Sequence, residues 1–303
     1  RWFGFGLILS STELPNPPST TLRPRSSLNC STGMSWMALE ALRKFELGLQ
    51  YCEETWSVEL RFTAVLLVAP MPIPLEPPGL EPETDRVDVP GVPGAFVLVD
   101  FLTRNETAAL RAAAHAVGWR RDAPDPRAPE KGRLDYCEVM AWNGYAERIW
   151  RRIAPHVPAG ARGINPRLRF FRYGPETIYR RHVDGSWPAG ELTDAGEYAV
   201  DASEGKRRSK LTLLLYLSEG FDGGATTFYD ARGGPGVAGD AAGAAAAAGE
   251  ITATPVLPRE GAALCFPHGD AEESPVHEGS SVRPGRNGER WKYVIRTDVM
   301  FEA

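Results

Sequence analysis

The chain has 303 residues, of which 43% are hydrophobic and 24% are charged. These values are ordinary for a soluble globular protein that can bury a full core. The formal net charge of −5 gives no broad attraction to nucleic acid or to anionic membranes, so we expect neither as a partner. The four cysteines form no CxxC pair, which excludes a zinc knuckle and a thioredoxin-like site and favours a reducing compartment.

The cellular location has little basis in the sequence. The first residue is Arg1 rather than Met, so we expect a fragment or a processed form from which any targeting peptide is missing. A cytoplasmic location is the default prediction. The endoplasmic reticulum is the alternative if the sequons at Asn29 and Asn105 carry glycans.

The first 90 residues differ from the rest of the chain. Proline-rich runs such as APMPIPLEPPGLEPE enclose one amphipathic pattern near SWMALEALRKFELGL. Proline at that density fixes backbone angles and removes hydrogen-bond donors. We therefore expect residues 1–90 to be a weakly ordered extension of unknown role, and residues 91–303 to form one domain.

The domain is expected to begin with one strand and two helices and to continue with further strands. The run AFVLVDFL predicts a first strand, and a capping box of Thr103 and Glu106 opens a helix that Gly118 closes. A second helix is predicted in YAERIWRRIAPHV, up to Pro155. Short apolar or alternating runs then indicate strands. These runs span residues 167–174, 209–218, 225–230, 261–269 and 291–301.

This order of elements predicts a mainly β fold with supporting helices. Strands that follow two helices, with Gly, Pro and charged turns between them, favour a closed antiparallel double sheet with the helices packed on one side. Residues 233–250 form a low-complexity insert of alanine and glycine. We expect this insert to be a surface loop, because it has no apolar stripe.

A candidate metal site lies in the stretch YRRHVDGSW. His182 and Asp184 stand two apart at the end of a predicted strand, so alternation turns both side chains to one face. A histidine near an aspartate is common on surfaces, and the pair needs a third ligand. Two histidines and one carboxylate form the facial triad of non-heme Fe(II) oxygenases. Zinc hydrolases use the same ligand types, but the HExxH pattern is absent from the sequence.

Two histidines compete for the third ligand position. His268 ends the predicted strand in CFPHGD, and His277 follows in SPVHEGSSV. Periodicity favours His277 but leaves both open. His115 and His156 fall on or beside the predicted helices, where a surface or helix-end role is expected.

Four blocks of the sequence together resemble one enzyme family. RFFRYGPETIYRRHVDGSW, SKLTLLLYLSEGFDGGATTFYD, FPHGDAEESPVHEGSSV and KYVIRTDVMF are similar in order, spacing and local text to the prolyl 4-hydroxylase-like branch of the 2-oxoglutarate and Fe(II)-dependent oxygenases. The resemblance covers about residues 92–301. It implies a double-stranded beta-helix (jelly-roll) core that holds Fe(II) through His182, Asp184 and His277. His268 would then be a neighbour of the site or a surface group.

The co-substrate 2-oxoglutarate needs a cation for the carboxylate that the metal does not hold. Lys292, Val294 and Arg296 alternate onto one face of the last predicted strand, so either basic residue could supply it. The resemblance assigns this role to Lys292, while a loop longer than the family's pattern, RPGRNGERW, keeps Arg296 as an alternative. Tyr173 matches a family tyrosine whose hydroxyl lines the 2-oxoglutarate pocket.

The resemblance implies a dioxygenase that hydroxylates a C–H bond and converts 2-oxoglutarate to succinate and CO2. O2 is the second co-substrate, and ascorbate is the expected reductant. The expected substrate is a peptide, with peptidyl proline as the family's best-known target, or a small molecule. The oligomeric state is left open.

Two other classes of protein compete with this interpretation. A catalytically silent jelly-roll binding module would keep the fold without needing the two histidines, the aspartate and the basic residue together. A metal-dependent hydrolase or cupin-like isomerase could use the same triad without oxygen. The presence of all four residues in the expected order favours the oxygenase.

Overall fold

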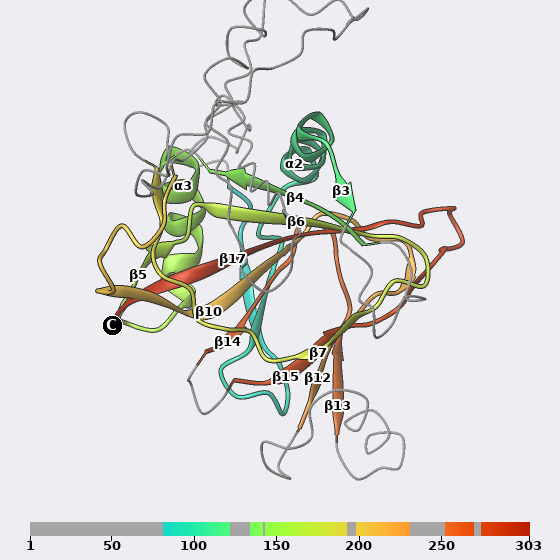
Figure 1. Ribbon diagram of the computed structural model, residues 1–303. Helices are drawn as coiled ribbons and strands as arrows, with labels where there is room; N and C mark the ends of the chain where they lie inside the picture. The colour runs from blue at the N-terminus through green and yellow to red at the C-terminus, as the bar shows by residue number, and fades with distance from the viewer. Residues whose placement is uncertain (1–80, 122–133, 142, 193–197, 231–251, 270–273) are drawn as a thin grey trace, which may run out of the picture. The chain divides into compact units, whose positions relative to one another are not determined.

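A computed structural model describes residues 81–121, 134–141, 143–192, 198–230, 252–269 and 274–303. All of them belong to one compact unit. Two antiparallel sheets lie face to face in this unit, and two helices cover the outer side of the larger sheet (Figure 1). The predicted jelly-roll class is therefore confirmed.

The large sheet has the strand order β1-β2-β14-β10-β17-β6-β4-β3, with β5 beside β17. Its strands are β1 (Asp85–Asp88), β2 (Phe96–Val99), β3 (Arg120–Arg121), β4 (Leu134–Met140), β5 (Ala161–Ile164), β6 (Arg167–Tyr173), β10 (Arg207–Tyr216), β14 (Ala263–Pro267) and β17 (Lys292–Glu302).

The small sheet has the order β13-β12-β15-β7 and packs against the inner face of the large one. Two short strand pairs, β8 with β9 and β11 with β16, lie outside both sheets. The bounds are β7 (Tyr179–His182), β8 (Glu191–Leu192), β9 (Tyr198–Ala199), β11 (Asp222–Gly223), β12 (Thr226–Tyr229), β13 (Ala253–Val256), β15 (Val276–Gly279) and β16 (Val282–Arg283).

The two faces of the large sheet bury different sets of side chains. On β10, Leu213 and Leu215 join the core beneath the helices. Tyr216 joins a second core between the two sheets, with Leu214 packed against it. A central strand covered on both faces needs apolar residues at consecutive positions, which explains the run LTLLLYL in the sequence.

The helices begin and end as their sequence signals predict. In α2 (Arg104–Val117), the backbone N–H of Glu106 donates to Thr103 Oγ1 at 3.2 Å, and the N–H of Thr103 donates to the Glu106 carboxylate at 2.8 Å. Gly118, with a φ of 92°, ends the helix. The second helix, α3 (Asn143–Ile153), passes into a 3-10 turn, η1 (Ala154–His156), that contains the proline. Neither helix is long and apolar enough to cross a lipid bilayer.

The first strand lies earlier in the chain than the sequence indicates. We expect a strand from residue 95, but β1 already pairs with β2 from Asp85, in register with Val99. All four residues of β1 are exposed, so the strand has no apolar alternation by which to recognise it. The remainder of the predicted extension, residues 1–80, and the predicted insert at 233–250 lie outside the described residues.

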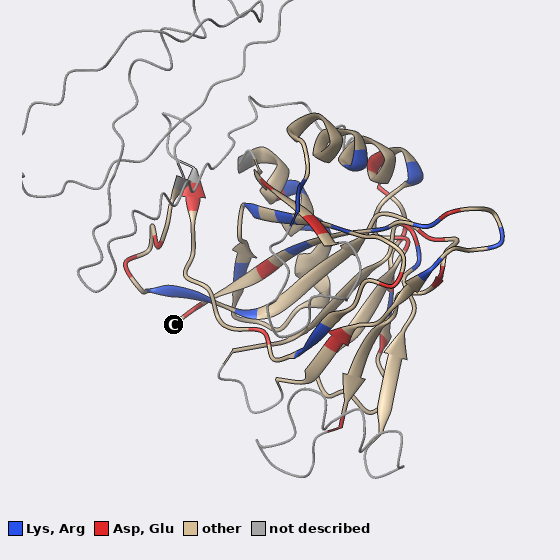
Figure 2. Cartoon of the chain, turned by 45° about the vertical axis from the view of Figure 1, so that its right-hand side comes forward, with Lys and Arg blue, Asp and Glu red and all other residues tan. Residues whose placement is uncertain are grey.

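Acidic and basic residues are interspersed along the described strands and loops (Figure 2). Some of them lie inside the molecule, and each of these needs a specific partner there. The Glu106 side chain is fully buried, and Arg152 of α3 reaches it with two nitrogens, at 2.8 and 3.0 Å. This pair joins the two helices.

Replacing Arg152 with Met would remove the two charged hydrogen bonds that Arg152 donates to the buried Glu106 carboxylate. We expect a loss of about 3–5 kcal/mol in the free energy of unfolding, measured by chemical denaturation. The control is Arg104→Met, because Arg104 pairs with Glu219 on the surface and its side chain is 77% exposed. That change should cost at most about 1 kcal/mol. Equal losses in both variants would contradict the prediction.

Candidate metal centre and adjoining cavity

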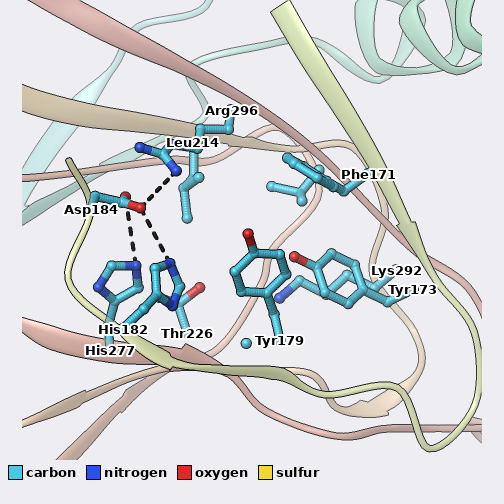
Figure 3. A pocket seen from close by; sticks show the side chains of 12 residues that line it. Phe171, Tyr173, Tyr179, His182, Asp184, Leu214, Thr226, His277, Lys292 and Arg296 are labelled. Carbon is cyan, nitrogen blue, oxygen red and sulfur yellow. Dashed lines mark ion pairs between the residues drawn. The ribbon is translucent and has the colours of Figure 1, made fainter. Parts of the chain in front are cut away.

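The pairing of β7 with β15 brings the two candidate histidines together. His182, the last residue of β7, is the register partner of His277 in β15, and their ring centroids are 4.3 Å apart. Asp184 follows β7 by two residues, and its carboxylate oxygens lie 3.2 Å from Nε2 of His182 and 3.6 Å from Nε2 of His277 (Figure 3). The three potential ligand atoms lie within 4.8 Å of one another.

Backbone carbonyls fix the orientation of both imidazole rings. Nδ1 of His182 lies 2.6 Å from the carbonyl oxygen of Arg180, and Nδ1 of His277 lies 3.2 Å from that of Pro275. A carbonyl only accepts, so each Nδ1 donates its proton to a carbonyl, and each Nε2, which faces Asp184, is available to a metal. Burial lowers the pKa of His277 to about 4, which keeps this ring neutral at neutral pH. Both rings are thus arranged as metal ligands are.

Asp184 supplies the negative charge of the cluster. It is 3% exposed, and Oδ2 accepts a hydrogen bond from Thr212 Oγ1 at 2.7 Å. Burial raises its pKa, but the neighbouring imidazole of His182 and the charge of Arg296 outweigh burial and hold the pKa well below its usual range. Nη1 of Arg296 lies 2.6 Å from Oδ1. Even so, no described group donates a well-aligned hydrogen bond to that oxygen.

The donor set fits a divalent transition metal. Two imidazole nitrogens and a buried, ionised carboxylate oxygen without an aligned donor lie around one point. Two histidines and one carboxylate leave further coordination positions open, which distinguishes the non-heme Fe(II) triad from closed structural zinc sites.

A cavity of about 40 Å³ adjoins the cluster, and Figure 3 shows its walls. The three candidate ligands lie at one side, Lys292 and Tyr173 lie at the other, and the ring of Tyr179 lies between them. Six strands, β6, β7, β10, β12, β15 and β17, supply the wall together with Asp184, which follows β7. The lining residues are Phe171, Tyr173, Tyr179, His182, Asp184, Leu214, Thr226, His277, Gly279, Lys292, Val294 and Arg296.

Lys292 is a buried cation without a described anionic partner. It is 2% exposed, and its Nζ donates to the carbonyl oxygen of Gly224 at 2.7 Å and lies 4.9 Å from the ring centre of Tyr173. Among the residues that the structure describes, no carboxylate lies within ion-pair distance of it. Burial therefore lowers the pKa of Lys292 to about 7. A buried ammonium is stable only beside a counter-charge, so this end of the cavity favours an anion.

Arg296 has a different environment from Lys292, although both lie on the inner face of β17. Its guanidinium lies 2.6 Å from Asp184 and 3.6 Å from Asp298. Two carboxylates therefore already balance its charge. Of the two candidate cations, Lys292 is the one whose surroundings are suited to a carboxylate ligand.

Two neighbours of Lys292 shape the cavity wall. Tyr173 on β6 is its register partner, and burial raises the pKa of this phenol, which keeps it protonated and able to donate. Gly279 of β15 also lines the cavity, close to Tyr173 and Tyr179. A Cβ at that position would be 3.1 Å from Cβ of Tyr179 and 3.5 Å from the ring of Tyr173, so any larger residue would narrow the cavity.

His268, the rival third ligand, lies outside the cluster. It is 1% exposed, and its two ring nitrogens each lie 2.7 Å from a hydroxyl, Nδ1 from Thr212 and Nε2 from Ser209. Thr212 is not among the residues predicted from the sequence, although alternation with Leu214 on β10 places it on the inner face. Phe171 was also missed and could have been found by the same alternation with Tyr173.

The comparisons with known proteins agree with this geometry. A jelly-roll that gathers two histidines and a carboxylate is typical of non-heme Fe(II) oxygenases. Residues 168–295 match the family model of the 2OG-Fe(II) oxygenase superfamily, which confirms the resemblance found in the sequence. The match lies in the sheet core, and together with the two histidines and the carboxylate it supports an oxidoreductase of the dioxygenase type. No curated protein sequence matches the chain.

Several solved structures are similar at low sequence identity. A prolyl-4-hydroxylase from Pseudomonas putida is 17% identical, with 69% of this chain and 94% of that chain covered and a TM-score of 0.41. The viral collagen prolyl hydroxylase of Paramecium Bursaria Chlorella virus-1, in a 2OG complex, is 17% identical over 73% and 96%, with a TM-score of 0.40. A Trichoplax adhaerens prolyl hydroxylase, in complex with a hypoxia inducible factor peptide fragment, is 12% identical over 69% and 84%, with a TM-score of 0.40.

The lowered pKa of Lys292 predicts a pH-dependent stability in the absence of ligand. The unfolded lysine keeps its proton up to about 10.5, whereas the folded one loses it near 7. Burial of the charge therefore penalises folding fully below pH 7, and the penalty falls as the pH rises. We expect the wild type to gain on the order of 1 kcal/mol per pH unit between pH 7 and 9 relative to Lys292→Met.

The measurement is the free energy of chemical unfolding of both proteins over this pH range. Lys210→Met is the matched control, because Lys210 is an exposed lysine of the neighbouring strand β10. Its unfolding free energy should follow that of the wild type at every pH. If the difference between the wild type and Lys292→Met is constant with pH, the folded pKa of Lys292 is not lowered.

Proposed function

We propose that this protein hydroxylates a C–H bond of its substrate while 2-oxoglutarate is decarboxylated to succinate and CO2. His182, Asp184 and His277 are the proposed Fe(II) ligands, and Lys292 is the proposed partner of the far carboxylate of 2-oxoglutarate. One observation carries the proposal. A buried lysine without a described acidic partner shares a cavity with two imidazoles and a carboxylate. A silent binding module has no need of this combination.

Bound iron, 2-oxoglutarate and O2 together would supply the oxidising power for C–H hydroxylation. The protein's own part is to hold ligands and exclude water. The carbonyls of Arg180 and Pro275 keep the two imidazole rings in the tautomer that offers Nε2 to the metal. The apolar wall residues Phe171, Leu214 and Val294 would limit water around the bound groups.

Lys292 would orient the co-substrate through its charge and its position. An arriving carboxylate favours the ammonium form, because it supplies the counter-charge that the buried lysine lacks. Binding above pH 7 should therefore be accompanied by proton uptake. Arg296 would instead balance the charge of Asp184, 2.6 Å away, which supports Lys292 as the proposed partner of the co-substrate.

The substrate that we propose is a peptide, with peptidyl proline as the first candidate. The support is the resemblance of the four sequence blocks to the prolyl 4-hydroxylase-like branch. Ascorbate as reductant and a cytoplasmic location stay predictions from the sequence. Succinate release that depends on O2 and on an added proline-containing peptide is the assay for the substrate.

The first test is an anaerobic titration of the purified protein with Fe(II) and then 2-oxoglutarate, followed by the metal-to-ligand charge-transfer absorption. We expect a band in the wild type and none in His277→Ala. Lys292→Met should bind Fe(II) normally but raise the Kd for 2-oxoglutarate about 30-fold or more, because a buried charged hydrogen bond is lost. Lys210→Met should behave as the wild type.

The same titration distinguishes the roles of Lys292 and Arg296. Arg296→Met should change metal binding, because it alters the surroundings of Asp184, and should affect the Kd for 2-oxoglutarate less than Lys292→Met does. If Arg296→Met alone weakens 2-oxoglutarate binding, the far carboxylate belongs to Arg296. If the folded wild type gives no band at all, the oxygenase proposal fails and a binding module becomes the better interpretation.

A further inference from the structure

A line of buried hydrogen bonds leads from the candidate metal ligand Asp184 into the large sheet. Thr212 Oγ1 lies 2.7 Å from Asp184 Oδ2, and Nδ1 of His268 lies 2.7 Å from the same Thr212 oxygen. Nε2 of His268 lies 2.7 Å from Ser209 Oγ. The four residues are at most 3% exposed, so water cannot replace these contacts at little cost.

The chemistry of the groups fixes the direction of the first two hydrogen bonds. The carboxylate of Asp184 is ionised and only accepts, so Thr212 must donate its single hydroxyl proton to it. Thr212 can then only accept from His268, which places a proton on Nδ1. The carboxylate of Asp298 lies 3.8 Å from that nitrogen and favours the same protonated position.

The direction of the third hydrogen bond follows from the neutrality of His268. Burial lowers the pKa of this imidazole and outweighs the opposing charges of Asp298 and Asp184. A neutral ring that is protonated on Nδ1 has a lone pair on Nε2, so Ser209 donates to it. Ser209 Oγ in turn accepts from the backbone N–H of Trp187 at 2.8 Å. Every hydrogen bond in the line therefore points toward Asp184.

The backbone of Asp184 is held as well as its carboxylate. The N–H of Gly269, the residue after His268, donates to the carbonyl oxygen of Asp184 at 2.8 Å. Trp187 and Asp184 belong to the same loop, so several hydrogen bonds attach this loop to β10 and to the end of β14. The loop has no regular secondary structure between Val183 and Trp187, and these attachments take the place of a strand.

From this arrangement we propose that Thr212 and His268 are positioning residues that fix the Asp184 carboxylate for metal binding. Thr212 orients the carboxylate directly, and His268 acts through Thr212 by keeping its hydroxyl proton directed at Asp184. The inference rests on the proposed metal site. It assigns to His268 a role in orienting a ligand rather than in binding the metal itself.

The test is the Kd for Mn(II) of the metal-free protein, followed by electron paramagnetic resonance without co-substrate or turnover. Thr212→Val keeps the shape of the side chain and removes the hydroxyl, and we expect metal binding to weaken about 10-fold to 100-fold. Thr212→Ser keeps a hydroxyl and should restore the Kd to within about threefold of the wild type by the same reasoning.

Thr297→Val is the matched control. Thr297 is also fully buried, and its hydroxyl also donates a 2.7 Å hydrogen bond, but to the carbonyl oxygen of Asn165 on the other face of the sheet. Its loss should lower stability much as Thr212→Val does and leave the Kd for Mn(II) unchanged. A purely structural role of Thr212 predicts equal metal binding in the two valine variants.

His268 is tested by two further variants. Asparagine places an amide donor near the position of Nδ1, so His268→Asn should bind Mn(II) more tightly than His268→Leu, which offers no donor. Nitrogen NMR of the wild type should find the His268 proton on Nδ1 and none on Nε2. If the His268 variants do not fold, the comparison of Thr212→Val, Thr212→Ser and Thr297→Val decides the question.

The outcomes distinguish this inference from the proposed function. If the folded wild type binds neither Mn(II) nor Fe(II), both fail. If it binds Mn(II) and Thr212→Val binds equally well, the metal site stands and the positioning role is wrong. The role is also wrong if Thr212→Ser is as weak as Thr212→Val, because the hydroxyl is then not the feature that matters.

Discussion

The pairing of β7 with β15 is the constraint on which the candidate site depends. It places His182 directly opposite His277, so that two segments about ninety residues apart present their imidazoles to one point. The register of this pairing must be exact, because a slip of one residue would turn a histidine side chain to the other face of the sheet. The aspartate lies beyond the end of β7, where no ladder holds it, and hydrogen bonds from β10 and from Gly269 hold it instead.

The inner face of β17 carries the charges that the rest of the site requires. Alternation places Lys292, Arg296 and Asp298 on this face, where each is largely removed from water. Burial of charge is costly, and the protein supplies counter-charges to Arg296 but none that is described to Lys292. Asp184 and Asp298 surround Arg296, whereas Lys292 has a carbonyl and aromatic rings but no described carboxylate. The charges at the metal end of the cavity are thus balanced by protein groups, whereas the charge of Lys292 at the opposite end is balanced only when an anion binds.

The sequence predicts the parts of this site that depend on local periodicity. The spacing of His182 and Asp184 and the shared face of Lys292 and Arg296 follow from strand alternation alone. The sequence could not choose between the two basic residues, because the difference lies in which carboxylates the neighbouring loop and strand bring to them. It could not predict the hydrogen bonds of Thr212 either, since its partners are 28 and 56 residues away and meet only through the register of three strands.

Different strands hold the metal end and the Lys292 end of the candidate site. The hydrogen bonds that orient Asp184 run through β10 and β14, while Lys292 is fixed by β6 and by the turn at Gly224. Substitutions among the residues that orient Asp184 should alter metal binding and have little effect on binding of the co-substrate carboxylate. Substitutions around Lys292 should have the opposite pattern, because distant sites without shared partners act additively. Arg296 is the exception. It contacts Asp184 and also lines the cavity, so it is the residue through which the charge of a bound metal and the charge of a bound co-substrate would influence one another.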